Sequence, residues 1–291
     1  MMAGKKLRIA SAQLNHAGSI TRNLAKIEAA VARARRNRAD AILFPECALT
    51  GYAIDWRGVR PGDVRAGLRD AGAIAKAHGI HVLLGAPIIL GRKRFNGMVV
   101  FDRGGRPTHA YAKCQLTAGD RESFSPGDAV SLFEIDGVPS TSIICHERRY
   151  PELVRLPVMM GARVLFHPNA GLDALAVSRS KRGGRDGVVS RAFENAIYYV
   201  FANTVGPQGG GRWSAGDSKI VAPDMSTLAW AGNRGEAVVV ATVDLSQATG
   251  RYALDMLKHP RFLVPGWRRM LRDARRRAGE ASQVLIEAIG F

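Results

Sequence analysis

Short apolar runs alternate with segments of helical periodicity along this chain, and this alternation constrains the fold more than any other feature. Residues 7–14 (LRIASAQL) and 39–46 (ADAILFPE) are compact, largely apolar runs of the kind that form buried strands. The apolar positions between them recur at helical spacing: Leu24, Ile27, Val31 and Ala34. The order strand, helix, strand predicts a βαβ unit and therefore an α/β fold.

The same rhythm continues along the chain. Apolar residues again recur at helical spacing before a strand-like run over residues 80–89: Val64, Leu68, Ala71 and Ala75. Residues 96–113 (NGMVVFDRGGRPTHAYAK) predict two strands around a Gly-Gly turn. Further strands are predicted within residues 139–147, 162–170, 197–206, 217–232 and 236–245, the last two segments as hairpin-type strands, with helices over 151–161 and about 187–196.

The length of 291 residues exceeds the roughly 100 to 200 residues of a usual domain, but one large α/β domain can reach it. The chain has no linker, low-complexity block or internal repeat, so we expect one domain over residues 1–245. Residues 246–291 form a basic C-terminal extension, which we expect to pack on the same domain or at an oligomer interface.

Nothing in the sequence indicates a membrane. No apolar run approaches the roughly 18 to 20 residues that a membrane span requires, and the first residues show no secretory signal. The three cysteines, Cys47, Cys114 and Cys145, form no disulfide framework and no CxxC pair. We therefore expect a cytoplasmic protein whose thiols are available for chemistry.

The chain is strongly basic, with 42 Lys and Arg residues against 25 Asp and Glu residues and a net charge of +17. Much of the excess lies in three separate segments with few aromatic residues, at 33–38, 178–185 and 267–277. We interpret these segments as solvated surface and do not expect nucleic-acid binding. A catalytically retired scaffold that binds a polyanion is the alternative function from another class.

Cys145 is the first candidate for chemistry. It lies in "IICHERRYPE" (residues 143–152), where a predicted strand gives way to a turn, and side chains at the carboxyl ends of α/β strands project into ligand-binding crevices. A thiol nucleophile needs a proton acceptor and gains from a nearby cation. Glu46 and Lys113 each follow a predicted strand and could supply these functions. The alternatives are a buried structural cysteine and two surface charges.

Five segments together carry a resemblance to a known family. These are "FPECALTGY", "YAKCQL" and "IICHERRYPE", followed by "SRAFENAIYYVFANTVG" and "GDSKIVAPDMSTLA". The first three resemble the glutamate, lysine and cysteine motifs of the nitrilase superfamily of carbon–nitrogen hydrolases, and they occur in the family's order. The resemblance extends from about Leu7 to Leu245, and its branch is similar to the amidases and N-carbamoyl amino acid amidohydrolases.

This resemblance implies a four-layer α-β-β-α sandwich and a catalytic triad of Glu46, Lys113 and Cys145. Cys145 would attack the carbon of a linear amide or an N-carbamoyl (ureido) compound, form a thioester, and release ammonia or an amine. Glu46 would transfer protons, and Lys113 would stabilise the oxyanion. The resemblance implies no metal or organic cofactor and a homodimer or larger homo-oligomer. A nitrilase that converts a nitrile to an acid is the alternative within the superfamily.

A second acid often precedes a "FxPG"-like turn in this family, and the turn here is "DRESFSPG". Asp120 lies four residues before Phe124 and Glu122 lies two before it; we favour Asp120 and keep Glu122 as the alternative. The lysine motif departs from the family pattern, because Ala112 and Gln115 replace an arginine and a histidine. The support around the lysine is therefore expected to differ.

Four further residues are candidates for binding substrate. His146, which adjoins the cysteine, is expected to line the pocket, with a Cys-His dyad as the alternative. Arg148 and Arg149 could grip a substrate carboxylate, as the resemblance to N-carbamoyl amino acid hydrolases implies, or form ion pairs with nearby glutamates. Asn169 lies in "HPN", a predicted strand-end segment beside the pocket that we do not interpret as a metal site.

Overall fold

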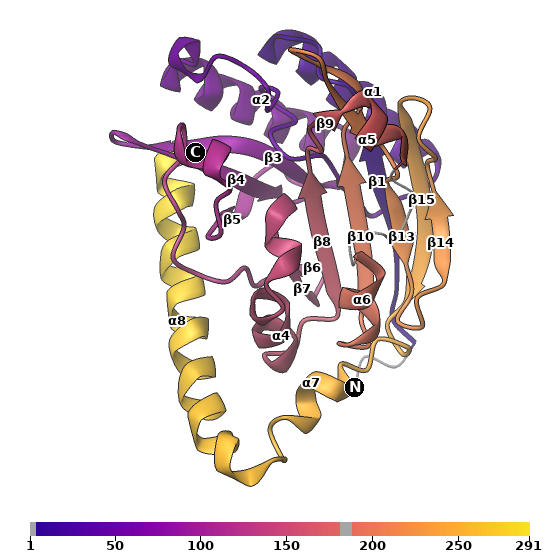
Figure 1. The fold of residues 1–291 in the computed structure, drawn as a ribbon, viewed down its shortest axis with the longest axis vertical. Helices are drawn as coiled ribbons and strands as arrows, with labels where there is room; N and C mark the ends of the chain where they lie inside the picture. Colours follow the sequence, from indigo (N-terminus) through magenta and orange to yellow (C-terminus); the bar gives the residue numbers. More distant parts are fainter. Residues whose placement is uncertain (1–3, 181–187) are drawn as a thin grey trace.

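Two six-stranded sheets lie face to face in the computed structural model, which describes residues 4–180 and 188–291 (Figure 1). The first sheet has the order β15-β1-β2-β3-β4-β5, with β15 (Ala237–Asp244), β1 (Lys6–Gln13), β2 (Ala41–Leu43), β3 (His81–Leu90), β4 (Lys93–Phe101) and β5 (Pro107–Ala112). The second has the order β14-β13-β10-β8-β7-β6, with β14 (Thr227–Trp230), β13 (Lys219–Val221), β10 (Tyr198–Asn203), β8 (Val164–Asn169), β7 (Val138–Ser142) and β6 (Phe133–Ile135).

Helices cover the outer face of each sheet. The longer helices are α1 (Ile20–Arg36), α2 (Pro61–His78), α4 (Glu152–Met159) and α8 (Val264–Ile289). Short helices are α3 (Ala118–Arg121), α5 (Leu175–Ser180), α6 (Val188–Phe193) and α7 (Arg251–Asp255), with single turns η1 (Trp56–Gly58), η2 (Cys145–Arg149) and η3 (Arg261–Leu263). A small third sheet, β11-β12-β9, contains β11 (Val205–Gly209), β12 (Arg212–Ala215) and β9 (Asp173–Ala174).

The layers are held together by three apolar cores. Side chains such as Leu43 and Phe166 fill the space between the two sheets. A second core lies between the first sheet and α1 and α2, and it includes Ile27 and Leu68. A third lies between the second sheet and α4 and α6. Burial of both faces explains why the strands read as continuous apolar runs, and it confirms the predicted α-β-β-α sandwich.

The predicted βαβ unit is confirmed, because β1 and β2 are parallel neighbours joined through α1. The hairpin predicted within residues 217–232 is also present as β13 and β14. The strand at 236–245 was wrongly assigned to the same hairpin group. β15 instead pairs antiparallel with β1 along its whole length and is the edge strand of the first sheet. Of the helix expected at about 187–196, the described residues contain α6 (Val188–Phe193), and Gly187 lies outside them.

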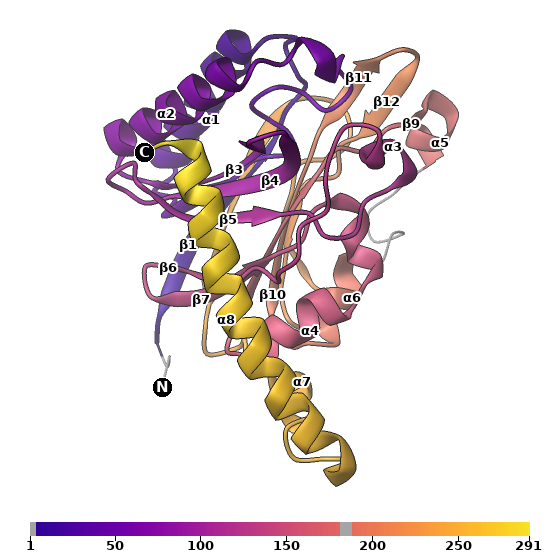
Figure 2. The same ribbon diagram turned by 90° about the vertical axis from the view of Figure 1, so that its left-hand side faces the viewer.

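The C-terminal extension ends against the first sheet, where α8 lies across β5 (Figure 2). The Ser282 hydroxyl accepts a hydrogen bond from the Ala110 backbone N–H at 3.0 Å. Leu285 and Ile289 are buried in the core beneath α2, and the ring of Phe291 lies 5.7 Å from that of Phe101. Within the described residues, no helix combines the length and apolar character that a membrane span needs.

Candidate active site

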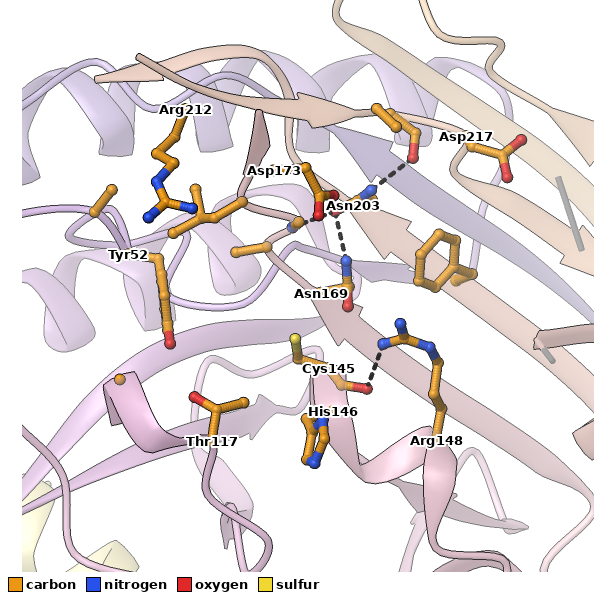
Figure 3. Close-up of a pocket in the computed structure, with 18 of the residues that line it drawn as sticks. Tyr52, Thr117, Cys145, His146, Arg148, Asn169, Asp173, Asn203, Arg212 and Asp217 are labelled. Carbon is orange, nitrogen blue, oxygen red and sulfur yellow. Dashed lines mark hydrogen bonds between the residues drawn. The ribbon is translucent and has the colours of Figure 1, made fainter. Parts of the chain in front are cut away.

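Three strand ends bring the predicted site residues together. Glu46 follows β2 and Lys113 follows β5 in the first sheet, whereas Cys145 begins η2 just after β7 in the second sheet. The sheet arrangement thus gathers residues that lie far apart in the sequence at one end of the sandwich. Cys145 lies at the base of a pocket of about 780 Å³ (Figure 3).

Lys113 lies between two carboxylates beneath this pocket. Its ammonium donates to Glu46 Oε1 at 3.0 Å and to Asp120 Oδ2 at 2.9 Å, and all three side chains are fully buried. Burial alone would lower the pKa of Lys113, but the carboxylates and the nearby Cys145 thiol raise it well above its usual value. Lys113 is therefore a permanent cation at neutral pH.

The Glu46 carboxylate is held on both oxygens. Oε1 also accepts from the Asn96 side-chain amide at 2.7 Å, and Oε2 accepts from the Ala170 backbone N–H at 2.9 Å. A carboxylate has about four lone-pair sites, so these three donors fix its orientation and leave capacity for one more proton donor. Glu46 is thus a fixed acceptor beside the cysteine.

Asp120, and not Glu122, is the second acid that forms an ion pair with Lys113. Asp120 Oδ1 accepts from the Tyr52 hydroxyl at 2.7 Å, and Oδ2 accepts from the backbone N–H and hydroxyl of Thr117 at 2.9 and 3.0 Å. Burial alone would raise the pKa of Asp120, but Lys113 and these hydrogen bonds lower it overall. Glu122, the residue after α3, is exposed and contacts neither Lys113 nor Glu46 in the described part of the chain.

Cys145 has a left-handed backbone conformation, with φ of 50°, which is strained for a residue other than glycine. Two side chains hold its carbonyl oxygen: Arg148 Nη1 donates at 3.2 Å and His167 Nε2 donates at 3.0 Å. The Tyr199 hydroxyl in turn lies 2.5 Å from His167 Nδ1. Burial, reinforced by Glu46, raises the pKa of the Cys145 thiol to about 12, so the resting group is a thiol.

Glu147 anchors the turn that carries the cysteine. Its buried carboxylate accepts from the backbone N–H groups of Ile144 at 2.7 Å and Cys114 at 2.7 Å, and from the Tyr111 hydroxyl at 2.9 Å. Cys114 directly follows the catalytic candidate Lys113, so one side chain ties the lysine segment to the cysteine turn. Ion pairs of the two arginines with nearby glutamates were the alternative to carboxylate binding, but Glu147 is engaged by these donors and forms no ion pair with Arg148 or Arg149 among the described residues.

The remaining candidates line the pocket. His146 and Arg149 both border it, and Arg149 is exposed. The His146 ring points away from the Cys145 sulfur in Figure 3 and packs edge-on against Tyr150, which does not support a Cys-His dyad. Burial lowers the pKa of His146, with help from Lys113, so its ring is neutral at pH 7. Asn169 is buried in the pocket wall.

Three residues that contact the candidates were not predicted from the sequence: Asn96 and Ala170, which donate to Glu46, and Asn203, which accepts from Asn169. Asn96 is the lone polar side chain in the apolar stretch "FNGMVVF", which was a signal that could have identified it. Ala170 acts through its backbone N–H, which no side-chain pattern reveals. For metals, the described residues contain no group of three or more His, Cys, Asp or Glu side chains placed to hold an ion.

Comparisons with known proteins agree with this geometry. The sequence model of the carbon-nitrogen hydrolase family matches residues 8–252. This chain belongs to the carbon-nitrogen hydrolase family. It is therefore an enzyme that hydrolyses carbon–nitrogen bonds, as the three motifs predicted.

Among individual carbon-nitrogen hydrolases, the chain is 29% identical to 2-oxoglutaramate amidase of Bacillus subtilis, over 79% of this chain and 88% of that protein. It is 28% identical to an (R)-stereoselective amidase of a Pseudomonas species, over 81% and 85% of the two chains. The solved structure of an amidase variant from a Nesterenkonia species superposes with a TM-score of 0.76 at 25% identity, over 90% and 96% of the two chains. In that structure the acetamide moiety of fluoroacetamide is joined covalently to the active-site cysteine.

Proposed function

We propose that this enzyme is an amidase that cleaves small linear amides or ureido compounds through a thioester on Cys145. The observation that carries the proposal is the buried cluster of Glu46, Lys113 and Asp120 beneath a strained cysteine at the base of a pocket. The relatives named amidases support it, because two of them match the chain over more than three quarters of its length.

In the first half-reaction, the Cys145 sulfur attacks the carbonyl carbon of the substrate while Glu46 takes the thiol proton. Because the thiol has a raised pKa of about 12, it needs a base in contact with it at the moment of attack. The Lys113 ammonium stabilises the negative charge that develops on the carbonyl oxygen. Glu46 then passes the proton to the leaving nitrogen, and ammonia or an amine departs from the thioester.

In the second half-reaction, Glu46 takes a proton from a water molecule that attacks the thioester carbon. The carboxylate remains oriented for this step by its bonds to Asn96 and Ala170. Collapse of the tetrahedral intermediate releases the carboxylic acid, and the proton on Glu46 returns to the sulfur. Asp120 keeps Lys113 in place through both steps and does not itself touch the reacting atoms.

The two arginines have different roles in this proposal. Arg148 donates to the Cys145 carbonyl and so supports the nucleophile, whereas Arg149 is exposed on the pocket rim and is free to turn toward a substrate carboxylate. Arg149→Ala should raise KM about tenfold for amides with a carboxylate and leave neutral amides unchanged. Arg148→Ala should lower kcat for both kinds of substrate.

The decisive experiment is an ammonia-release screen across neutral amides, carboxylate-bearing amides, N-carbamoyl amino acids and nitriles, run beside Cys145→Ala. We expect release from amides or ureido compounds by the wild-type enzyme and none above background from the variant. Full release by Cys145→Ala would contradict the mechanism, and release from nitriles alone would identify a nitrilase instead.

We also infer that the protein works in the cytoplasm as a homodimer or larger assembly. Its three cysteines are all free thiols, which suits a reducing compartment. Large apolar side chains are exposed on α8 and its approach, including Phe262 at 80% exposure. Sedimentation of the purified protein would test the assembly, since a monomer at micromolar concentration would rule it out.

A further inference from the structure

The Asn169 side-chain oxygen is buried and has no hydrogen-bond partner in the part of the chain that the structure describes. Asn169 is only 6% exposed, and its Nδ2 donates to Asn203 Oδ1 at 2.8 Å. A buried polar atom without a partner is energetically unfavourable and uncommon in folded proteins, so Asn169 Oδ1 is a candidate to bind a ligand.

The neighbouring Asn203 decides which way the Asn169 amide faces. Asn203 Oδ1 accepts from the Gly171 backbone N–H at 3.1 Å, and its Nδ2 donates to the Gly216 carbonyl at 2.7 Å. A backbone N–H can only donate and a carbonyl can only accept, so the Asn203 amide has one possible orientation. Asn169 must then turn its own Nδ2 toward Asn203, which leaves Oδ1 directed the other way.

That direction is toward the nucleophile. Figure 3 shows Asn169 between Asn203 and Cys145, with its oxygen on the side of the cysteine. The next residue, Ala170, donates its backbone N–H to Glu46 Oε2 at 2.9 Å, so the same strand end also touches the proposed base. The unbound oxygen therefore faces the space in which Cys145 would attack and Glu46 would deliver a proton.

We propose that Asn169 Oδ1 accepts a hydrogen bond from an N–H of the group under attack, and that Asn203 acts as the positioning residue. The inference rests on the proposed function and deepens it, because it names what the site requires of a substrate. Primary amides and ureido groups carry such an N–H. Esters and nitriles do not, and with them the buried oxygen would stay unpaired.

The test compares a primary amide with the methyl ester of the same acid, using wild-type enzyme and Asn169→Leu. Leucine has nearly the shape of asparagine, and Asn203 Oδ1 keeps the Gly171 backbone N–H, at 3.1 Å, as a donor. We expect the ratio of kcat/KM for amide over ester to fall at least about tenfold. Asn169→Ala removes the same oxygen and replaces the leucine variant if that does not fold.

Ser214→Ala is the matched control, because it disturbs the same network and keeps Asn169 Oδ1 in place. Its amide-to-ester ratio should equal that of the wild type. An equal loss on amide and ester in the Asn169 variants, or no change in the ratio, would overturn the inference. Failure of the proposed function looks different: amide and ester turnover would both persist in Cys145→Ala.

Discussion

Asp120→Asn is the most specific perturbation of the buried charge cluster. It replaces one carboxylate oxygen with an NH2 group and removes one negative charge, with little change in shape. Asp120 Oδ2 accepts three hydrogen bonds, from Lys113 Nζ and from the backbone N–H and hydroxyl of Thr117. An amide nitrogen in that place would face donors only, and rotation of the amide would direct the nitrogen at the Tyr52 hydroxyl instead. Breaking a buried ion pair from one side costs about 3 to 5 kcal/mol.

We therefore expect Asp120→Asn to lower the free energy of unfolding in urea by about 3 kcal/mol or more. Amide turnover should fall at least about a hundredfold, because Lys113 loses one of its two fixed partners. Glu122→Gln is the matched control: this acid lies two residues away on the surface and should behave as wild type in both assays. A stable, active Asp120→Asn, or a larger effect at Glu122, would refute the reasoning.

The pH dependence of stability gives the same residue a second test. The pKa of Asp120 is lower in the folded protein than the usual value of about 3.9. Its contribution to stability is therefore present above about pH 4 and is lost as the pH falls through the depressed folded value. Between about pH 4 and pH 2 the wild-type protein should lose stability more steeply than Asp120→Asn; equal slopes would argue against a charged Asp120.

Three further predictions follow from other contacts. Glu46→Gln should abolish amide turnover. It should nevertheless speed alkylation of Cys145 by iodoacetamide at pH 8 to 9, because loss of the negative charge of Glu46 lowers the pKa of the thiol. Slower alkylation than in the wild type would contradict this. Glu147→Gln should cost about 3 kcal/mol in urea unfolding and lower kcat, with Tyr111→Phe costing about 1; equal costs would show that the backbone bonds matter little. Leu285→Ala should cost about 2 to 5 kcal/mol in one cooperative transition, whereas an independent early transition would mean that α8 is a separate unit.

Part of the candidate site could be predicted from the sequence. Glu46, Lys113 and Cys145 each follow an apolar run, so they were expected at strand ends, and the structure brings Glu46 to Lys113. Their roles as a triad were implied by the resemblance to the nitrilase superfamily and stay a prediction. Asp120 was preferred over Glu122 from motif spacing, and the fold brings Asp120 to the lysine. These features are local or are repeated in a motif, so they can be recognised without coordinates.

What could not be predicted depends on pairing between distant strands. Asn96 reaches Glu46 only because β4 lies beside β3 in one register, and Asn203 orients Asn169 only because β10 lies parallel to β8. The pairing of β15 with β1 could not be predicted, because 223 residues lie between Gln13, where β1 ends, and Ala237, where β15 begins. The apolar residues of α8 (Val264–Ile289) recur at helical spacing. Its many arginines are equally typical of a solvated segment, so the pattern alone does not predict where α8 packs.

The central claim is that Cys145 carries the acyl group released from the amide nitrogen. It is tested most directly by acid-quenching the enzyme during turnover of a slow amide and mapping the added mass by peptide mass spectrometry. The account predicts one acyl group on the peptide that contains Cys145, sensitive to hydroxylamine and formed together with one equivalent of ammonia. Ammonia release with no acyl adduct, or an adduct on Cys47 or Cys114, would contradict it.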